Sequence, residues 1–269
     1  MKKFVIFLFA CFCTFPLLAQ GRGTYSILSI KGNIIDRKTD KELFIGDKVD
    51  LQTEFRFGDT YDEAVLLSPS KVKYWLKMPE SMFAAQQLVV SSQQALQTVR
   101  SRPIPMSGTR GGAAVKLASE GVSLETLKEY FGVDTFSVIG PSLQLPVTAA
   151  DLAQYRLVVR YEKNGVTDIK ADNFTLSKST LTDGDQSQIK ECYLLLDNGT
   201  TMQPVTQICL LFVDEERLLK EFSAYLAALN ARKTNTARTR KLLQQYCVDI
   251  YGNIDQSNLE KTINKFFGK

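Results

Sequence analysis

The sequence contains no histidine among its 269 residues, and this absence removes whole classes of catalytic site. Ser-His-Asp and Cys-His catalysis, the HExxH zinc site and proton relays that switch near neutral pH all require an imidazole. Cysteine is also scarce, and the three that lie outside the N-terminal leader are too scattered for a structural zinc site. We therefore expect no metal site, and no cofactor motif is recognisable.

Those three cysteines, Cys192, Cys209 and Cys247, are an odd number, which does not make a disulfide framework. Cys192 and Cys209 fall in two apolar runs that we expect to pair as strands, so one bridge between them stays open. The pattern favours the other interpretation, in which they are small buried side chains.

Long apolar runs are missing except at the N-terminus. Lys2 and Lys3 precede an almost wholly apolar stretch, residues 4–18, and Ala19 offers a small residue before a cut. This order is typical of a signal peptide, so we expect residues 1–20 to be removed and the protein to reach the periplasm, the outer envelope or the medium. A retained anchor and lipoprotein processing at Cys11 are the alternatives.

Charge of one sign is not in large excess. Without Lys2 and Lys3 the chain has 31 basic residues against 29 acidic ones. This balance argues against a dedicated nucleic-acid binder and against a strongly basic membrane-surface protein. We expect no nucleic-acid partner and no transmembrane span in the mature protein, while the oligomeric state is left open.

The N-terminal part, residues 21–80, has the pattern of short strands separated by Gly, Asp and Pro turns. The run from Val49 to Phe57 alternates, with Phe55 and Phe57 on one face, and residues 72–78 alternate in the same way. We predict a small β-barrel or sandwich here.

A local resemblance supports this prediction over about 25–30 residues. The pattern consists of two short groups: Ile30-x-Gly32-x-Ile34 and Leu43-x-x-Gly46-Asp47-x-Val49. It resembles the opening strands of small SH3-like and FecR-type periplasmic β-barrels. The resemblance implies a fold and no activity.

The rest of the chain mixes both kinds of element, so the expected fold class is α+β. Residues 81–112 are predicted to form a helical or extended connector, and residues 113–213 a second β-rich region. Ser123 and Gly132 are placed to begin and end a short helix. Residues 214–269 carry apolar stripes at helical spacing and are predicted to form helices that pack on that region.

The clearest binding candidate is Trp75, the only tryptophan, which lies between Lys73 and Lys77 on the polar face of its strand. An aromatic ring in that position either packs under another element, which is the favoured interpretation, or stacks on a partner. Arg110, in the glycine-rich stretch 108–112, is a second candidate because glycines allow backbone N–H groups to converge on an anion. A flexible joint is the favoured interpretation there, and the anion-binding loop is the alternative.

Three further patterns have simpler explanations. Ser68 and Lys71 match the Ser-x-x-Lys spacing of serine acyl-enzymes, but they lie between two strands, where a turn is expected. Residues 183–185 offer acidic oxygens for calcium without the spacing of an EF-hand. A basic group at residues 232–241 contacts either solvent or anionic lipid or glycan phosphate.

These observations favour an exported protein of the cell envelope that binds or assembles with a protein or glycan partner and has no catalytic activity. The alternative is a histidine-independent hydrolase that uses paired carboxylates or a Ser-Lys pair.

Overall fold

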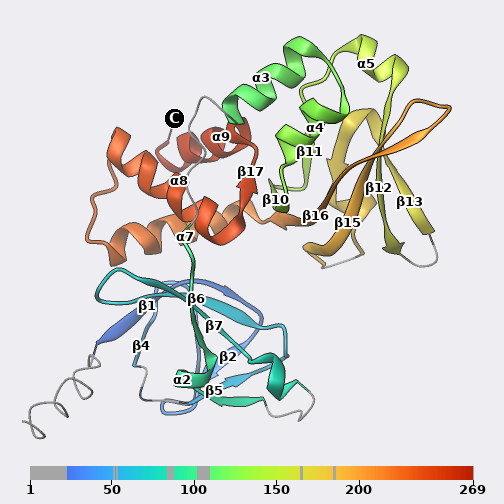
Figure 1. The fold of residues 1–269 in the computed structure, drawn as a ribbon. Coiled ribbons are helices and arrows are strands. Elements are labelled where there is room, and N and C mark those ends of the chain that lie inside the picture. Colours follow the sequence, from blue (N-terminus) through green and yellow to red (C-terminus); the bar gives the residue numbers. More distant parts are fainter. Residues whose placement is uncertain are drawn as a thin grey trace, which may run out of the picture. The chain divides into compact units, whose positions relative to one another are not determined.

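The computed structural model describes residues 23–268 except 51, 53, 84–87, 102–109, 164–165 and 184–185. The chain divides into two compact units, Met1–Thr98 and Val99–Lys269. Helices and several sheets are both present, so the fold class is α+β, as predicted (Figure 1). Among the described residues no helix has both the length and the apolar content needed to cross a membrane. The predicted signal peptide and Cys11 lie outside the described residues.

The first unit is built from two antiparallel sheets. The larger has the order β4-β1-β6-β7-β9, with bounds Lys48–Asp50, Thr24–Lys31, Glu63–Leu67, Lys73–Lys77 and Leu96–Thr98. The smaller has the order β3-β2-β5-β8, with bounds Lys41–Glu42, Ile34–Asp36, Glu54–Phe57 and Val89–Ser91. The run from Val49 to Phe57, expected as one strand, is thus divided between two sheets. The Asp50 carboxylate accepts the N–H of Gln52 at 3.1 Å, which favours a turn at this point.

Both sheets contribute to one apolar core. Phe55 and Phe57 of the smaller sheet and Leu66 and Leu76 of the larger one are fully buried in the same cluster. Alternation along each strand puts every second residue into this core, which is why the sequence pattern was informative. No closed barrel is found among the described strands, so that part of the prediction remains untested.

The first unit extends beyond residue 80, where the sequence pattern places the start of a connector. The segment that follows contains η2 (Glu80–Met82) and α2 (Ser92–Ala95), and its strands β8 and β9 pair with β5 and β7. These pairings complete both sheets, and the boundary between the units therefore lies after Thr98.

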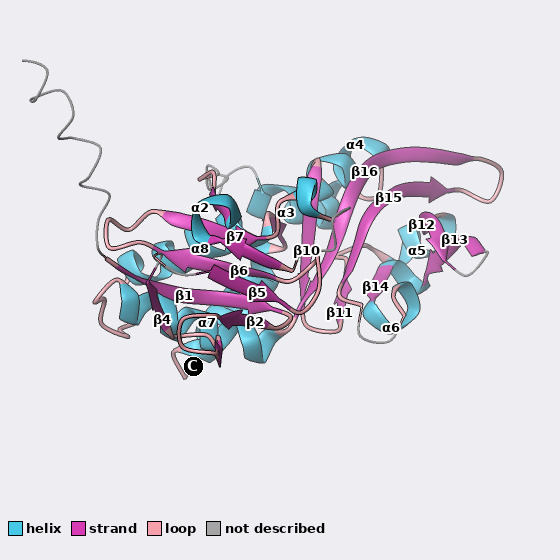
Figure 2. Cartoon of the chain, turned by 90° about the horizontal axis from the view of Figure 1, so that it is seen from below, coloured by secondary structure: helices cyan, strands magenta, loops and turns pink. Residues whose placement is uncertain are grey.

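The second unit centres on a six-stranded sheet of order β13-β12-β15-β16-β10-β17. The strands span Val166–Ala171, Arg156–Lys163, Gln188–Asp197, Met202–Val213, Asp134–Ile139 and Asn253–Ile254. β10 runs parallel to β16 and to β17, whereas the other neighbours are antiparallel. β15 and β16 form a long hairpin that extends past β10, because β10 pairs only with the second half of β16 (Figure 2).

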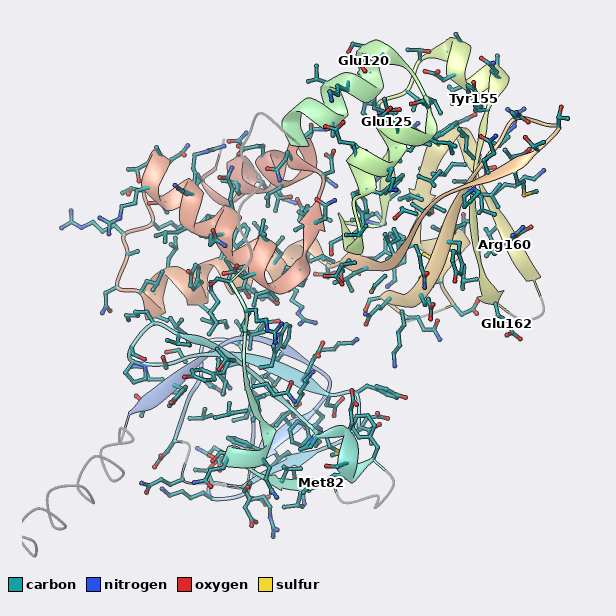
Figure 3. The ribbon with its side chains drawn as sticks, viewed as in Figure 1. Met82, Glu120, Glu125, Tyr155, Arg160 and Glu162 are labelled. Atoms are coloured by element: carbon teal, nitrogen blue, oxygen red, sulfur yellow. The ribbon has the colours of Figure 1, made fainter. Side chains whose placement is uncertain are left out.

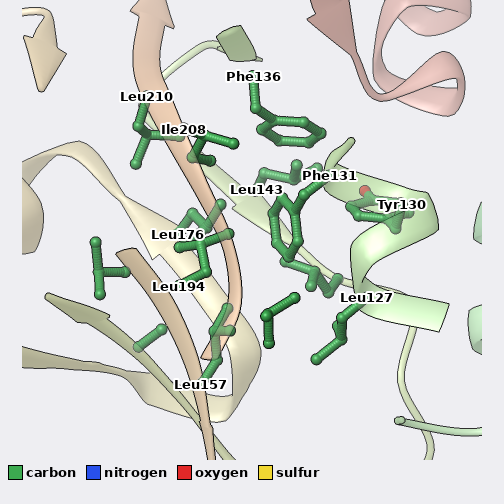
Figure 4. Close-up of a cluster of buried hydrophobic side chains, with 14 of the residues drawn as sticks. Leu127, Tyr130, Phe131, Phe136, Leu143, Leu157, Leu176, Leu194, Ile208 and Leu210 are labelled. Atoms are coloured by element: carbon green, nitrogen blue, oxygen red, sulfur yellow. The ribbon is translucent and has the colours of Figure 1, made fainter. Parts of the chain in front are cut away.

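One face of this sheet, the inner face, packs on a large apolar core (Figure 4). Leu157, Leu194 and Ile208 point into it from three strands. The elements that share this core or lie beside it are α3 (Arg110–Glu120), α4 (Leu124–Phe131), β11 (Ser142–Gln144), α5 (Ala149–Gln154), η3 (Asp172–Phe174), β14 (Thr175–Ser177) and α6 (Lys178–Leu181). As predicted, Ser123 caps α4 and Gly132, with φ of +69°, ends it.

Three C-terminal helices pack at the edge of the sheet that is formed by β10 and β17. They are α7 (Glu215–Ala228), α8 (Ala237–Tyr251) and α9 (Gln256–Phe266). Side-chain hydrogen bonds to backbone carbonyls fasten them there. The hydroxyl of Ser137 donates to the carbonyl of Tyr251 at 2.5 Å, and the amide of Asn258 donates to the carbonyl of Ile139 at 3.0 Å. The outer face of the sheet is therefore covered at this end.

Candidate functional site

The outer face of β12, β15 and β16 presents a row of polar and aromatic side chains to solvent. Alternation along β12 buries Leu157 and Val159 in the core and turns Arg160 and Glu162 outward, where both are exposed (Figure 3). Strand register then aligns Arg160 with Tyr193 on β15, and Tyr193 with Gln207 on β16. We call Arg160, Tyr193 and Gln207 the outer row.

Hydrogen bonds organise the outer row. Arg160 binds Asp168 of β13 through two contacts, 2.6 Å from Nε and 3.0 Å from Nη2. The amide of Gln207 donates to the carboxylate of Glu191. Tyr193, between these two pairs, keeps 44% of its surface exposed. The row is therefore positioned by its neighbours while its central ring remains accessible.

The next row of the same face is apolar. Val158 pairs with Leu195, and these side chains are 0% and 4% exposed. Beyond them Met202 is 45% exposed, and its sulfur lies 3.9 Å from Nη2 of Arg160. The face thus combines an apolar base with charged and aromatic groups around it.

The ion pair in the outer row is not suited to proton transfer near neutral pH. The hydrogen bond to Asp168 raises the pKa of Arg160, and the hydrogen bond from Arg160 lowers the pKa of Asp168. Both groups stay charged across the physiological range, whereas a general acid or base needs a pKa near the working pH. The pair is therefore a fixed charged contact on the surface of the sheet.

The three residues predicted around the tryptophan all lie on β7 and are half-buried: Lys73, Trp75 and Lys77. Leu76 lies on the opposite face, in the core of the first unit, and Trp75 is absent from that core. Trp75 is aligned with Val65 of β6 and with Gln97 of β9. Trp75 and Leu76 therefore lie on opposite faces, as predicted, but Val65 beside Trp75 is fully buried, so the face is not polar throughout. A partner contact at Trp75 stays a prediction.

The glycine-rich candidate is described only in part. Arg110 is the first residue of α3, so residues 110–112 are helical, and the side chain of Arg110 lies outside the described part of the chain. Residues 108–109 also lie outside it. The predicted anion-binding loop at these residues therefore remains a prediction.

Ser68 and Lys71 occupy the turn between β6 and β7, as predicted. The N–H of Lys71 donates to the carbonyl of Ser68 at 2.9 Å, and Lys71 has a φ of +67°. The hydroxyl of Ser68 accepts the N–H of Val72 at 3.0 Å. A Ser-x-x-Lys catalytic pair needs one helical face, which this turn does not provide.

The basic group at residues 232–241 lies in the connection from α7 to α8 and in the first turns of α8. Arg240 binds Glu260 and Asn264 of α9, so it joins two helices.

Of the three cysteines, Cys192 and Cys247 are buried, Cys209 is half-buried, and none is in a disulfide. Cys192 is aligned with Ile208, so the side chain of Cys209 points to the opposite face of the sheet. Cys192 and Cys209 therefore form no disulfide bridge in this structure.

A buried carboxylate that sequence reasoning missed lies between α7 and α8. Glu221 is 0% exposed, and its oxygens accept bonds from Arg217 Nε at 3.0 Å, Tyr246 at 3.0 Å and Tyr251 at 2.5 Å. Burial, and then the charge of Glu221, raise the pKa of Tyr246 well above its usual range. The available signal was the helical spacing of Leu218, Glu221 and Tyr225, which puts an acid in the apolar stripe. Because this cluster is enclosed, we infer that it stabilises the fold.

In the part of the chain that the structure describes, no group of three or more Cys, Asp or Glu side chains is placed to hold a metal ion. Residues 184–185, part of the calcium candidate, lie outside that part. No family model, curated protein or solved structure matches this chain.

Proposed function

We propose that this protein is an exported cell-envelope binding or assembly protein without catalytic activity, whose β-sheet surfaces contact a protein or glycan partner. The observation that carries the proposal is the outer row, in which an arginine, a tyrosine and a glutamine stand side by side on adjacent strands. Neighbouring strands lie about 4.8 Å apart, so the three groups can contact one partner together.

The residue types support recognition. Tyrosine and arginine are enriched among the residues that contribute most to binding, because each combines a large flat contact area with directional hydrogen bonds. Tyr193 is exposed, and Arg160 is already oriented by Asp168, so little side-chain freedom is lost when a partner binds. An exposed sheet face suits a macromolecule better than a small substrate, which is usually bound in a cleft.

Two further parts of the proposal come from the sequence. Trp75, with Lys73 and Lys77, is proposed as a second contact surface in the first unit. Residues 1–20 are proposed to be the signal that directs export, and N-terminal sequencing of the protein recovered from the cell envelope tests this. A protein that still begins at Met1 would contradict it.

Site-specific photo-crosslinking tests the proposed surface. A benzophenone amino acid replaces Tyr193 in one variant, Trp75 in a second and Val115, which is 64% exposed on α3, in a control. In envelope preparations we expect one defined adduct from position 193 and none from position 115. Identical adducts from both positions would contradict a specific surface.

The identified partner then allows affinities to be measured. Tyr193→Ala and Arg160→Ala are each expected to weaken binding by about 5- to 30-fold, the range of ordinary interface anchors. Val115→Ala should change the affinity by less than about twofold. If all three variants bind as tightly as the unsubstituted protein, the outer row is not the binding surface.

A further inference from the structure

The excess positive charge of this chain is concentrated in one place. Between Glu221 and Asp249 there is no acidic residue, and the stretch contains five basic ones, Arg232, Lys233, Arg238, Arg240 and Lys241. The chain has 33 basic and 29 acidic residues, so all other positions together hold 28 basic and 29 acidic residues. The near-neutral balance of the whole sequence therefore conceals a local excess of positive charge at the connection from α7 to α8, whose course can be followed in Figure 1.

Two of the five cations hold the connection in place. Arg240 bonds to Glu260 and Asn264 of α9, and the ammonium of Lys233 lies 4.3 Å from the ring centre of Phe266. The other three, Arg232, Arg238 and Lys241, are exposed, and no described carboxylate lies within ion-pair distance of them. We call these three residues the cationic corner.

The fold gains little from the cationic corner. Arg238 and Lys241 lie in the first turns of α8, where no acidic residue is present. Cations are unfavourable near a helix N-terminus because they oppose the helix dipole. The two side chains are three residues apart and so project from the same side of the helix. An anionic partner would give these three charges the counter-charges that the described residues do not supply.

We propose that the cationic corner binds the surface of a membrane that contains anionic phospholipids. This inference rests on the proposed export, which brings the chain to the cell envelope. Lipid headgroups move laterally, so they can match three cations that form no enclosed pocket. Among the described residues of α7, α8 and α9 no large apolar side chain is strongly exposed, so contact stays at the level of the headgroups.

Vesicle flotation tests the proposal directly. The probe is phosphatidylcholine vesicles with about one third phosphatidylglycerol, compared with pure phosphatidylcholine. The corner variant carries Arg232→Gln, Arg238→Gln and Lys241→Gln. The control variant removes three exposed lysines from separate elements, through Lys48→Gln, Lys128→Gln and Lys170→Gln.

Each cation near an anionic surface strengthens binding by about fivefold, so partitioning of the corner variant should fall about 100-fold. The partitioning of the control variant onto the vesicles should fall far less. High salt should release the unsubstituted protein from the vesicles. The variants are prepared as the exported, processed chain and differ only at these positions, so every other contribution to vesicle binding is the same in all of them. Circular dichroism establishes that each variant is folded.

Three results would overturn the inference: equal binding by the unsubstituted chain and the corner variant, equal binding to both vesicle types, or binding to an anionic glycan without binding to vesicles. Crosslinking from position 193 reports on the outer row independently. A failure of the membrane contact therefore leaves the proposed function standing, and a failure of crosslinking at position 193 leaves the membrane contact standing.

Discussion

The buried cluster around Glu221 gives the sharpest quantitative prediction for stability. Glu221→Ala removes a fully enclosed carboxylate that accepts bonds from Arg217, Tyr246 and Tyr251. The substitution removes the acceptor that two tyrosine hydroxyls and one guanidinium share. We expect the free energy of unfolding to fall by about 3–5 kcal/mol, because two buried tyrosine hydroxyls each lose a bond to a charged acceptor.

Removing a single tyrosine hydroxyl should lower the free energy of unfolding by less. Tyr246→Phe removes one bond to a charged acceptor, for which the expected loss is about 1.5–3 kcal/mol, and the carboxylate keeps its other two donors. Tyr251→Phe should behave similarly. Because the groups share one acceptor, the losses are not additive, and a double-mutant cycle of Glu221→Ala with Tyr246→Phe should show coupling of about 1 kcal/mol or more.

Urea unfolding followed by circular dichroism measures these differences. Glu216→Ala is the matched control, since Glu216 is an exposed acid on the same helix and should cost about 0.5 kcal/mol. The explanation is refuted if Glu221→Ala costs no more than this control, or if its loss adds to that of Tyr246→Phe without coupling.

Three further predictions concern other parts of the chain. Gly32→Ala should cost more than about 3 kcal/mol and Gly46→Ala only about 1 kcal/mol in the same urea assay. Both have positive φ, but a Cβ on Gly32 would lie 1.7 Å from the Asp62 carboxylate, and one on Gly46 meets nothing within 4 Å; equal losses would exclude this cause. Burial acts to raise the pKa of Asp151, but hydrogen bonds to its carboxylate outweigh this and lower it. Its stabilising effect should therefore be full above about pH 4 and disappear as pH falls through the lowered pKa, and Asp151→Asn should flatten this acid limb of the unfolding midpoint. Pro204 lies on the half of β16 that β10 leaves unpaired, so Pro204→Thr should restore an edge N–H and increase self-association in light scattering, and unchanged scattering would argue against a protective role.

Short-range sequence patterns were sufficient to predict many individual helices, strands and turns. Ser123 and Gly132 bound α4 as expected, because a cap and a positive-φ terminator act within a few residues of the chain. The turn at Ser68 and the pairing of the strands that carry Cys192 and Cys209 also followed from local signals. Alternation and turn chemistry are properties of neighbouring residues, so a sequence read by itself contains them.

The pairing of distant segments could not be predicted from such local patterns. Strands β8 and β9 contain three residues each, which is too short for a clear period, and only pairing with β5 and β7 makes them strands. The outer row exists because register aligns Arg160, Tyr193 and Gln207, which lie far apart in the chain. The sequence by itself determined which residues alternate, cap and turn, since those preferences are local. The tertiary structure decided which faces are covered and which acids are buried, because burial depends on the element that packs opposite.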